Sequence, residues 1–359
     1  MANPIASVPA LQTNGPPASG VDLRLWRTAE NQLGTNLAKA TAAIARLDER
    51  LLLHPHREAL IARLAMLEVC DLSWADGSDI PIERLALYRV ARSGGGQGDA
   101  RGLLRADWAI RRLTHHDVDI DNRDALIAFL GLTINQSADD ELMDLIDRAL
   151  GPLFVHELDA WIEILRGGGD LHPLTRAAIG YQFWKFLELS RGTDMIEPAV
   201  VAARLGAAGC EALPFVPIAT RNRRALQNLG LEPAQRLQAW LIRVTAACKA
   251  ARREMIRINV WQGRAHEAIS GMSGKTPARL VEALIAHPVV CVRMLAEEGD
   301  VSPASAGRAL ALFEEIELTK EVTGGERFRY WRCAHKHRID DNLPRVQEIE
   351  QCTSISPPT

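Results

Sequence analysis

The sequence has no long apolar run. Hydrophobic residues make up 47% of its 359 residues, yet no stretch approaches the roughly 18 consecutive apolar residues that a membrane-spanning helix needs. Residues 1–20, rich in Pro, Gly, Ala and Ser, also lack the basic start and the apolar core of a signal peptide. We therefore expect a cytoplasmic protein without a membrane partner, in which residues 1–20 form a disordered leader.

Paired cysteines are also missing. The six cysteines are scattered, and no two form a Cys-x-x-Cys motif: Cys70, Cys210, Cys248, Cys291, Cys333 and Cys352. This scatter favours reduced thiols over a disulfide framework. The segment Cys333-x-His335-x-His337 lacks a fourth zinc ligand at the usual spacing. A polar loop explains the His and Asp residues of 115–121 as well as a metal cluster does, so we expect no bound metal.

Common catalytic signatures are absent as well. The triple glycines at Gly94–Gly96 and Gly167–Gly169 are not followed by Lys-Ser/Thr, so neither forms a phosphate-binding loop. No Gly-x-Ser-x-Gly motif marks a nucleophile elbow. The sequence therefore predicts no cofactor and no convincing active site.

Charge is distributed unevenly along the chain. The formal net charge is −3, but residues 219–338 carry 20 Lys and Arg against 12 Asp and Glu, whereas the remainder carries 22 against 33. A basic C-terminal third on an acidic body is typical of a polyanion-binding module joined to another domain. The alternative is an uneven but solvated surface.

Apolar residues recur at helical spacing through most of the chain. We predict a mainly α protein with one helix over residues 21–53, a second over residues 56–71, and a buried central helix from Leu174 to Leu189. The domains expected are a helical region over 21–130, a helical core with a long basic helix over 131–270, a DNA-binding domain over 271–335 and a tail over 336–359.

The stretch Lys275–Arg332 has the pattern of a winged helix-turn-helix. Three short amphipathic helices are expected: one after Thr276-Pro277, one from Val292 that Gly299 closes as a C-cap, and one capped by Ser302-Pro303. The exposed positions at the start of the third helix are small or basic, which is typical of a helix that enters the major groove. The segment that follows alternates around Gly324-Gly325, which predicts a β-hairpin wing.

The predicted partner is double-stranded DNA. We expect Ser305 and Arg308 to reach base edges, and Lys275, Arg279, Arg327 and Arg329 to contact phosphates. The complete set of predicted DNA-binding residues is Lys275, Arg279, Ser302, Ala304, Ser305, Arg308, Arg327 and Arg329. An Arg-rich stretch before this domain is either a solvated face or an extension of the phosphate-contacting surface: Arg221, Arg223, Arg224, Arg243, Lys249, Arg252, Arg253 and Arg257.

The order of parts resembles bacterial Fic-family proteins, in which helical regions precede a C-terminal winged helix. The segment Ala45–Gly77 is similar to the N-terminal helices of that family and ends in a turn at Ser73–Gly77. The C-terminal stretch is similar to the winged helix nearly end to end. The resemblance implies a Fic-like helical body followed by a winged helix-turn-helix with a small β-hairpin. The sequence also resembles a group of bacterial helix-turn-helix proteins, often plasmid-borne, to which no activity is attached.

Leu171-His172-Pro173-Leu174 falls where the resemblance places the catalytic loop, His-Pro-Phe-x-Asp/Glu-Gly-Asn-Gly-Arg. In active members the His is a general base, the acidic residue holds a metal, and the small residues with the Arg hold nucleotide phosphates. Here Arg176 replaces the acid, Ala177–Ile179 replace the phosphate-binding residues, and Gly180 replaces the Arg. His172 is thus a vestigial catalytic residue, without a metal ligand or a phosphate nest.

These patterns predict a DNA-binding transcriptional regulator with a catalytically inactive Fic-like body. A homodimer is possible, because two subunits can read two half-sites. One alternative is a divergent nucleotidyl (AMP) transferase that acts through His172. Another is a protein-interaction module in which the winged helix docks a partner chain.

Overall fold

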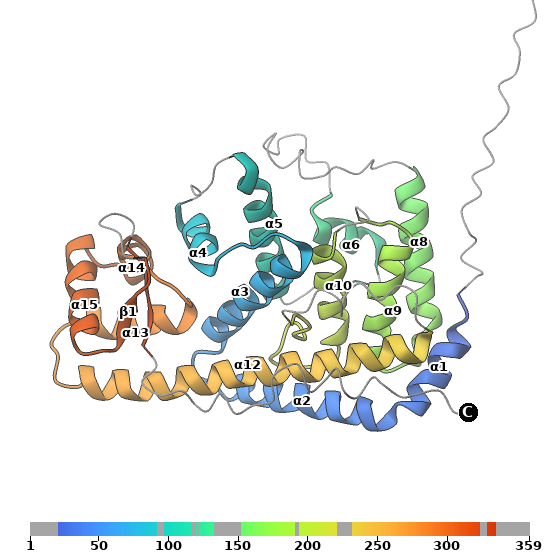
Figure 1. The fold of residues 1–359 in the computed structure, drawn as a ribbon, viewed down its shortest axis with the longest axis horizontal. Coiled ribbons are helices and arrows are strands. Elements are labelled where there is room, and N and C mark those ends of the chain that lie inside the picture. Colours follow the sequence, from blue (N-terminus) through green and yellow to red (C-terminus); the bar gives the residue numbers. More distant parts are fainter. Residues whose placement is uncertain are drawn as a thin grey trace, which may run out of the picture. The chain divides into compact units, whose positions relative to one another are not determined.

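The computed structural model describes residues 21–91, 97–115, 120, 122–132, 152–190, 194–220, 232–323 and 329–334. It divides into two compact units, with the boundary on helix α12 between Met255 and Ile256; Ile285–Pro288 groups with the first unit. The elements of the first unit are α1 (Leu23–Gln32), α2 (Gly34–Leu52), α3 (Arg57–Asp76), α4 (Ile82–Ala91), α5 (Gln97–Thr114), α6 (Arg123–Leu130), α8 (Pro152–Gly167), α9 (Pro173–Phe186), α10 (Ile196–Gly206) and most of α12 (Pro233–Ile269) (Figure 1).

The core of the first unit is formed where α9 packs on α10 and α8. Trp161 and Trp184 meet edge to face, with ring centroids 5.0 Å apart, and the indole of Trp161 donates to the carbonyl of Gly180 at 2.9 Å. A Cβ added at Gly180 would lie 2.7 Å from Leu205 Cδ1 on α10, so a larger residue there would require the Leu205 side chain to shift. The predicted buried central helix is confirmed.

Two local predictions in the N-terminal region are wrong. The single helix expected over residues 21–53 is interrupted at Leu33, which caps α1 just before Gly34 begins α2; glycine is a poor helix former and permits the break. The turn expected at Ser73–Gly77 is instead the last turn of α3, which ends at Gly77 in the left-handed conformation (φ 101°). Burial of Ser73 and Ala75 continues the helix past the predicted end.

Polar groups are buried inside this helical body. The carboxylate of Glu68 accepts the backbone N–H groups of Ile218 and Ala219 at 2.8 and 2.7 Å. Burial raises the pKa of Glu68 to about 8, although these two donors and Arg243 favour the charged form. Arg243 is itself only 5% exposed, and burial lowers its pKa to about 10. Arg243 is therefore a core residue and does not extend a phosphate-contacting surface.

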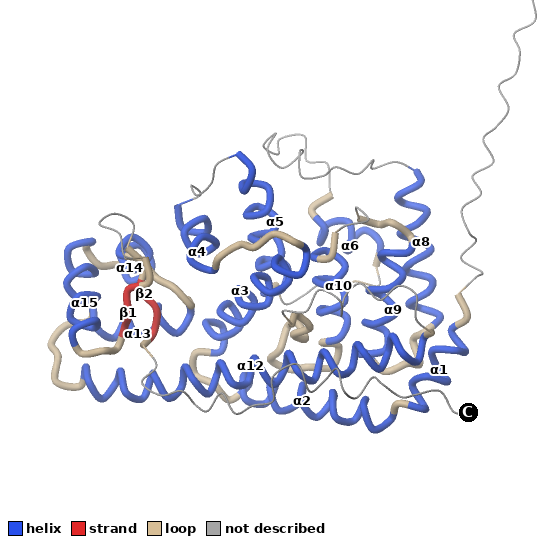
Figure 2. Tube along the Cα trace, viewed as in Figure 1, coloured by secondary structure: helices blue, strands red, loops and turns tan. Residues whose placement is uncertain are grey.

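The second unit contains the end of α12, α13 (Thr276–Ala286), α14 (Val292–Gly299), α15 (Pro303–Glu315), β1 (Thr319–Glu321) and β2 (Trp331–Cys333). The strands pair antiparallel, with Lys320 opposite Arg332. Within the described residues, named strands occur only in this hairpin (Figure 2), so the predicted mainly α class is confirmed. The indole of Trp261 on α12 donates to the carbonyl of Leu318 at 2.7 Å and ties the hairpin base to the helix.

No helix in the described ranges combines the length and apolar character needed to cross a membrane.

The raised pKa of Glu68 predicts how the free energy of unfolding depends on pH. The folded protein keeps its proton up to about pH 8, whereas an unfolded glutamate releases it near its ordinary value of 4.5. Folding therefore takes up a proton between these values, and stability falls as the pH rises through that window, by at most about 1.4 kcal/mol per pH unit. Between pH 5 and pH 8, the urea midpoint of Glu68→Gln should fall less steeply with pH than that of the wild type. Parallel pH profiles for the two proteins would contradict the raised pKa of Glu68.

Candidate DNA interface

Helices α14 and α15 form a helix-turn-helix. The turn consists of Asp300, Val301 and Ser302, a length typical of this motif, whose turns have about 3–4 residues. Asp300 lies in the left-handed region, with φ 47° and ψ 49°, and is the C-cap of α14. The predicted C-cap at Gly299 is thus wrong by one residue, because buried Gly299 still belongs to the helix. Asp is among the few non-glycine residues that tolerate this conformation.

Arg279 on α13 braces this turn. Its guanidinium donates to the carbonyl of Gly299 and, at 3.2 Å, to that of Asp300. The Asp300 carboxylate lies 3.7 Å away. The guanidinium therefore satisfies carbonyls that the end of α14 leaves without intrahelical partners. Arg279 was predicted to contact phosphate, and the structure assigns its hydrogen bonds to the turn.

The first two turns of α15 carry the predicted base-reading residues. Ser302 Oγ accepts the backbone N–H of Ser305 at 3.2 Å, so the predicted N-cap is confirmed. Ser302 Oγ lies 3.0 Å from Ser305 Oγ, and Arg308 Nη2 donates to Ser305 Oγ at 3.3 Å. Ser302, Ala304 and Arg308 are exposed, while Ala306 and Leu310 face the core. This face presents a short polar network beside a small methyl group.

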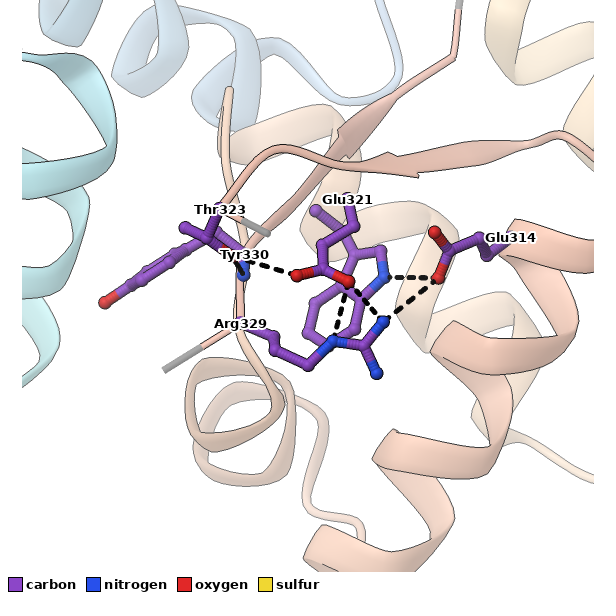
Figure 3. Close-up of polar contacts among 6 residues, drawn as sticks. Glu314, Glu321, Thr323, Arg329 and Tyr330 are labelled. Carbon is purple, nitrogen blue, oxygen red and sulfur yellow. Dashed lines mark hydrogen bonds and ion pairs between the residues drawn. The ribbon is translucent and has the colours of Figure 1, made fainter. Parts of the chain in front are cut away.

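Arg329, which was predicted to contact phosphate from the wing, pairs with acidic side chains of its own domain (Figure 3). Its Nε donates to Glu321 Oε2 at 2.7 Å, and its Nη2 lies 3.6 Å from Glu314 Oε2 on α15. Glu314 also accepts the indole N–H of Trp331 at 3.0 Å, and the guanidinium lies 4.9 Å from the centre of that ring. The hydrogen bond to Glu321 raises the pKa of Arg329. These contacts fasten the hairpin to α15.

Lys320 and Arg332 form a basic pair that the sequence reasoning missed. They face each other across the hairpin, and both are exposed, whereas Thr319, Trp331 and Cys333 are buried. Like charges directly opposite on paired strands repel, and within the described part of the chain neither has a hydrogen-bond or ion-pair partner. The alternation of Thr319–Glu321 and Trp331–Cys333 was the signal that could have identified them.

Several predicted features lie outside the described residues. They are the leader at residues 1–20, the Arg-rich start at residues 221–224, the Gly324-Gly325 turn with Arg327, and the tail with His335 and His337. Lys275 is described and exposed just before α13. The described ranges contain no group of three or more His, Cys, Asp or Glu side chains that could hold a metal ion.

The basic excess of the C-terminal third does not lie in the helix-turn-helix. Residues 219–277 carry 11 Lys and Arg against 3 Asp and Glu, while residues 278–338 carry 9 of each. The predicted basic module therefore consists of two adjoining parts. The helix-turn-helix has equal numbers of basic and acidic residues, and the segment before it, which contains α12, is basic. Affinity for a polyanion at α15 thus depends on how individual cations are placed, since the net charge there supplies little.

His172 is the N-cap of α9. Its Nδ1 accepts the backbone N–H of Leu174 at 3.1 Å, and its Nε2 lies 3.2 Å from Thr41 Oγ1. A ring whose Nδ1 accepts carries its proton on Nε2, which then donates to Thr41. Burial lowers the pKa of His172 and outweighs the opposite effect of Glu30, so the ring is neutral near pH 7. Both ring nitrogens have structural partners.

The residues after His172 form the first turns of α9. Thr175, Ala177, Ala178, Ile179 and Gly180 are all buried in the packed body. A phosphate nest requires backbone N–H groups that converge on open space. Here the chain continues as a regular helix, so its N–H groups beyond the first turn bond to carbonyls of α9 itself.

Residues 278–333 match the family described as "HTH DNA binding domain". The chain therefore contains a helix-turn-helix DNA-binding domain, as predicted. It is similar to the uncharacterized protein y4cF of Sinorhizobium fredii, with 24% identity over 372 residues that cover 82% of this chain and 94% of the relative.

The chain is also similar to the crystal structure of a Fic family protein from Desulfovibrio desulfuricans G20. The match has 15% identity and a TM-score of 0.43, and covers 85% of this chain and 97% of that one. The resemblance stated from the sequence is to the same family.

His172 provides a test of its capping role. An Asn side chain can cap a helix about as well as any residue, so His172→Asn should keep the stability of the wild type. His172→Ala leaves the N–H of Leu174 without its acceptor and should lower the free energy of unfolding by about 1 kcal/mol. Urea unfolding of the three proteins measures both effects. Equal losses for the Asn and Ala variants would show that the cap is not what His172 contributes.

Proposed function

We propose that the protein is a transcriptional regulator that binds a specific double-stranded DNA site through α15. The observation that carries this proposal lies at the exposed start of α15, where Ser302, Ser305 and Arg308 form one polar network next to exposed Ala304. An α-helix with such residues at its start fits the major groove, where guanidinium and hydroxyl groups can read base edges and methyl groups can contact thymine.

In this proposal the contacts are divided by role. Ser305 and Arg308 read bases, whereas Lys275 and Arg327 contact phosphates. Lys320 and Arg332 join the phosphate contacts, because they are exposed and lack counter-ions in the described part of the hairpin. Arg279 and Arg329 act in part by holding the turn and the hairpin in place.

The base-reading assignment predicts a difference between variants. Arg308→Ala should weaken binding to a selected site and relax its base preference, by about 1–3 kcal/mol. Arg327→Ala should weaken binding to all sequences alike. Fluorescence anisotropy on the selected site and on random duplex DNA measures both, with Arg166→Ala as the control, since Arg166 is an exposed arginine on α8. Equal losses for both variants on both DNAs would contradict this division.

The hairpin pair makes a separate prediction. Replacing Lys320 and Arg332 together by Gln should reduce the log–log dependence of affinity on salt by about 2, since each phosphate contact contributes roughly 0.9. The hairpin should remain folded, because the change removes a repulsion. Arg329→Gln is the contrasting variant: it breaks the contacts to Glu321 and should lower the melting temperature. An unchanged salt slope in the double variant would exclude these two cations from the interface.

Dimeric binding belongs to the same proposal. A single small DNA-binding module buries only about 600–1,000 Å² of protein surface, and a dimer that reads two half-sites gains affinity and specificity. Sedimentation of the protein with a selected DNA site tests this. A 1:1 complex at saturating protein would remove the dimer from the proposal.

We also infer that the helical body does not transfer AMP. The support is the packing of residues 173–180 as a buried helix and the structural partners of both His172 nitrogens. Incubation with labelled ATP and a divalent metal should give no labelled protein, in wild type and in His172→Ala alike. Label that appears in the wild type and disappears in His172→Ala would establish the nucleotidyl transferase instead.

A further inference from the structure

A groove on the helical body lies between α2 and the first part of α12. Both segments belong to the first unit and run alongside each other (Figure 1). The groove has a volume of about 480 Å³ and is lined by four cations, Lys39, Arg46, Lys249 and Arg252, with no carboxylate among its lining residues. A volume of this size is typical of sites for small ligands.

The spacing of the lining residues puts them on one face of each helix. Thr35 and Lys39 are one turn apart on α2, as Thr245 and Lys249 are on α12, and side chains four residues apart on a helix lie on the same side. Each helix therefore contributes a hydroxyl, a lysine and an arginine to the groove. Three alanines of α2 also line the groove.

Acidic residues nearby on the same helices have other partners. Asp48 on α2 accepts the backbone N–H groups of residues 211–213 at 3.0, 2.9 and 2.7 Å. Glu254 on α12 accepts Arg63 Nε at 2.7 Å. Burial raises the pKa of Cys248, which keeps this lining thiol uncharged. The carboxylates of Asp48 and Glu254 are therefore used elsewhere in the fold, and exposed Glu49 of α2 does not line the groove.

The four cations are left without counter-ions. Among the described residues, none of them has an ion-pair or hydrogen-bond partner, and the Nε atom of Arg252 is buried without an acceptor. Cations gathered in one groove repel one another and raise the local positive potential. An anion with several oxygens relieves this repulsion, because guanidinium and ammonium groups bind phosphate oxygens through charge-assisted hydrogen bonds.

We propose that this groove binds a small polyphosphate anion, either inorganic or the phosphate end of a nucleotide. Lys39 and Arg46 approach the phosphates from α2, and Lys249 and Arg252 approach from α12. Thr35 and Thr245 lie one turn away from the two lysines. Thr245 Oγ1 donates its proton to the carbonyl of Leu241, so the four cations supply the donors for the phosphate oxygens. The site is separate from His172 and does not depend on DNA binding.

Isothermal titration calorimetry of the full-length protein tests the proposal, with pyrophosphate, ATP and adenosine as probes and no divalent metal added. Pyrophosphate and ATP should bind and adenosine should not. Lys249→Ala and Arg46→Ala should each weaken pyrophosphate binding by about tenfold, the loss expected for one charge-assisted hydrogen bond. Arg253→Ala is the matched control, because it removes an exposed arginine of α12 that does not line the groove.

The probes also identify the source of the phosphate. Equal affinities for pyrophosphate and ATP support a site for phosphate groups alone, whereas tighter binding of ATP supports a nucleotide site. The absence of heat with either probe at about 50 mM salt would overturn the proposal, as would an equal loss in Arg253→Ala, which would indicate diffuse surface charge.

Two further measurements separate this site from the others. Binding that is lost in His172→Ala but kept in Lys249→Ala would place the anion at the start of α9 and overturn the proposal. The affinity of Lys249→Ala for duplex DNA should equal that of the wild type. If the wild type binds no pyrophosphate and Lys249→Ala weakens binding to duplex DNA, the groove contacts DNA phosphates and is not a small-anion site. A failure of DNA binding by the wild type would leave the calorimetric result intact.

Discussion

The close packing of α9 on α10 is the constraint on which the helical body depends. Gly180 allows the two helices to approach, and the indole of Trp161 bonds to its carbonyl while Trp184 stacks edge to face against Trp161. A larger residue at 180 would have to displace Leu205. The backbone N–H groups at the start of α9 are bonded within the helix, since those of Leu174, Thr175 and Arg176 all donate to His172. His172 caps α9, because the first N–H groups of a helix have no intrahelical acceptor.

In the helix-turn-helix, two of the arginines predicted to contact DNA form hydrogen bonds that hold its elements together. Arg279 holds the carbonyls at the end of α14, and Arg329 joins the hairpin to Glu321 and Glu314. The start of α15 remains exposed, and so do the cations Lys275, Lys320 and Arg332. Because residues 278–338 are balanced in charge, selectivity at this surface has to come from the placement of a few groups.

The basic excess belongs to a different part of the molecule. It is concentrated before residue 278, where Arg243 is a core residue and Lys249 and Arg252 line a groove with two cations of α2. Basic residues close together in sequence thus have three separate surroundings: a buried core, a groove and an exposed helix face. The net charge of the segment does not distinguish between these three kinds of surroundings.

Helical periodicity, capping residues and the Ser302-Pro303 signal were enough to predict a mainly helical chain, a buried central helix and a helix-turn-helix, because these depend on local spacing and local hydrogen bonds. The sequence could not show that Ser73 continues α3, that Asp300 takes the left-handed conformation in place of Gly299, or that Arg329 has two acidic neighbours. It also could not show that Thr41 and Leu174 occupy the two nitrogens of His172. These features depend on contacts between residues far apart in the chain or on small energy differences at helix ends. The amino-acid order by itself therefore determined the helices and the type of DNA-binding motif. The tertiary structure alone decided which charged groups remain available to a ligand, because a side chain is available only where folding has given it no partner.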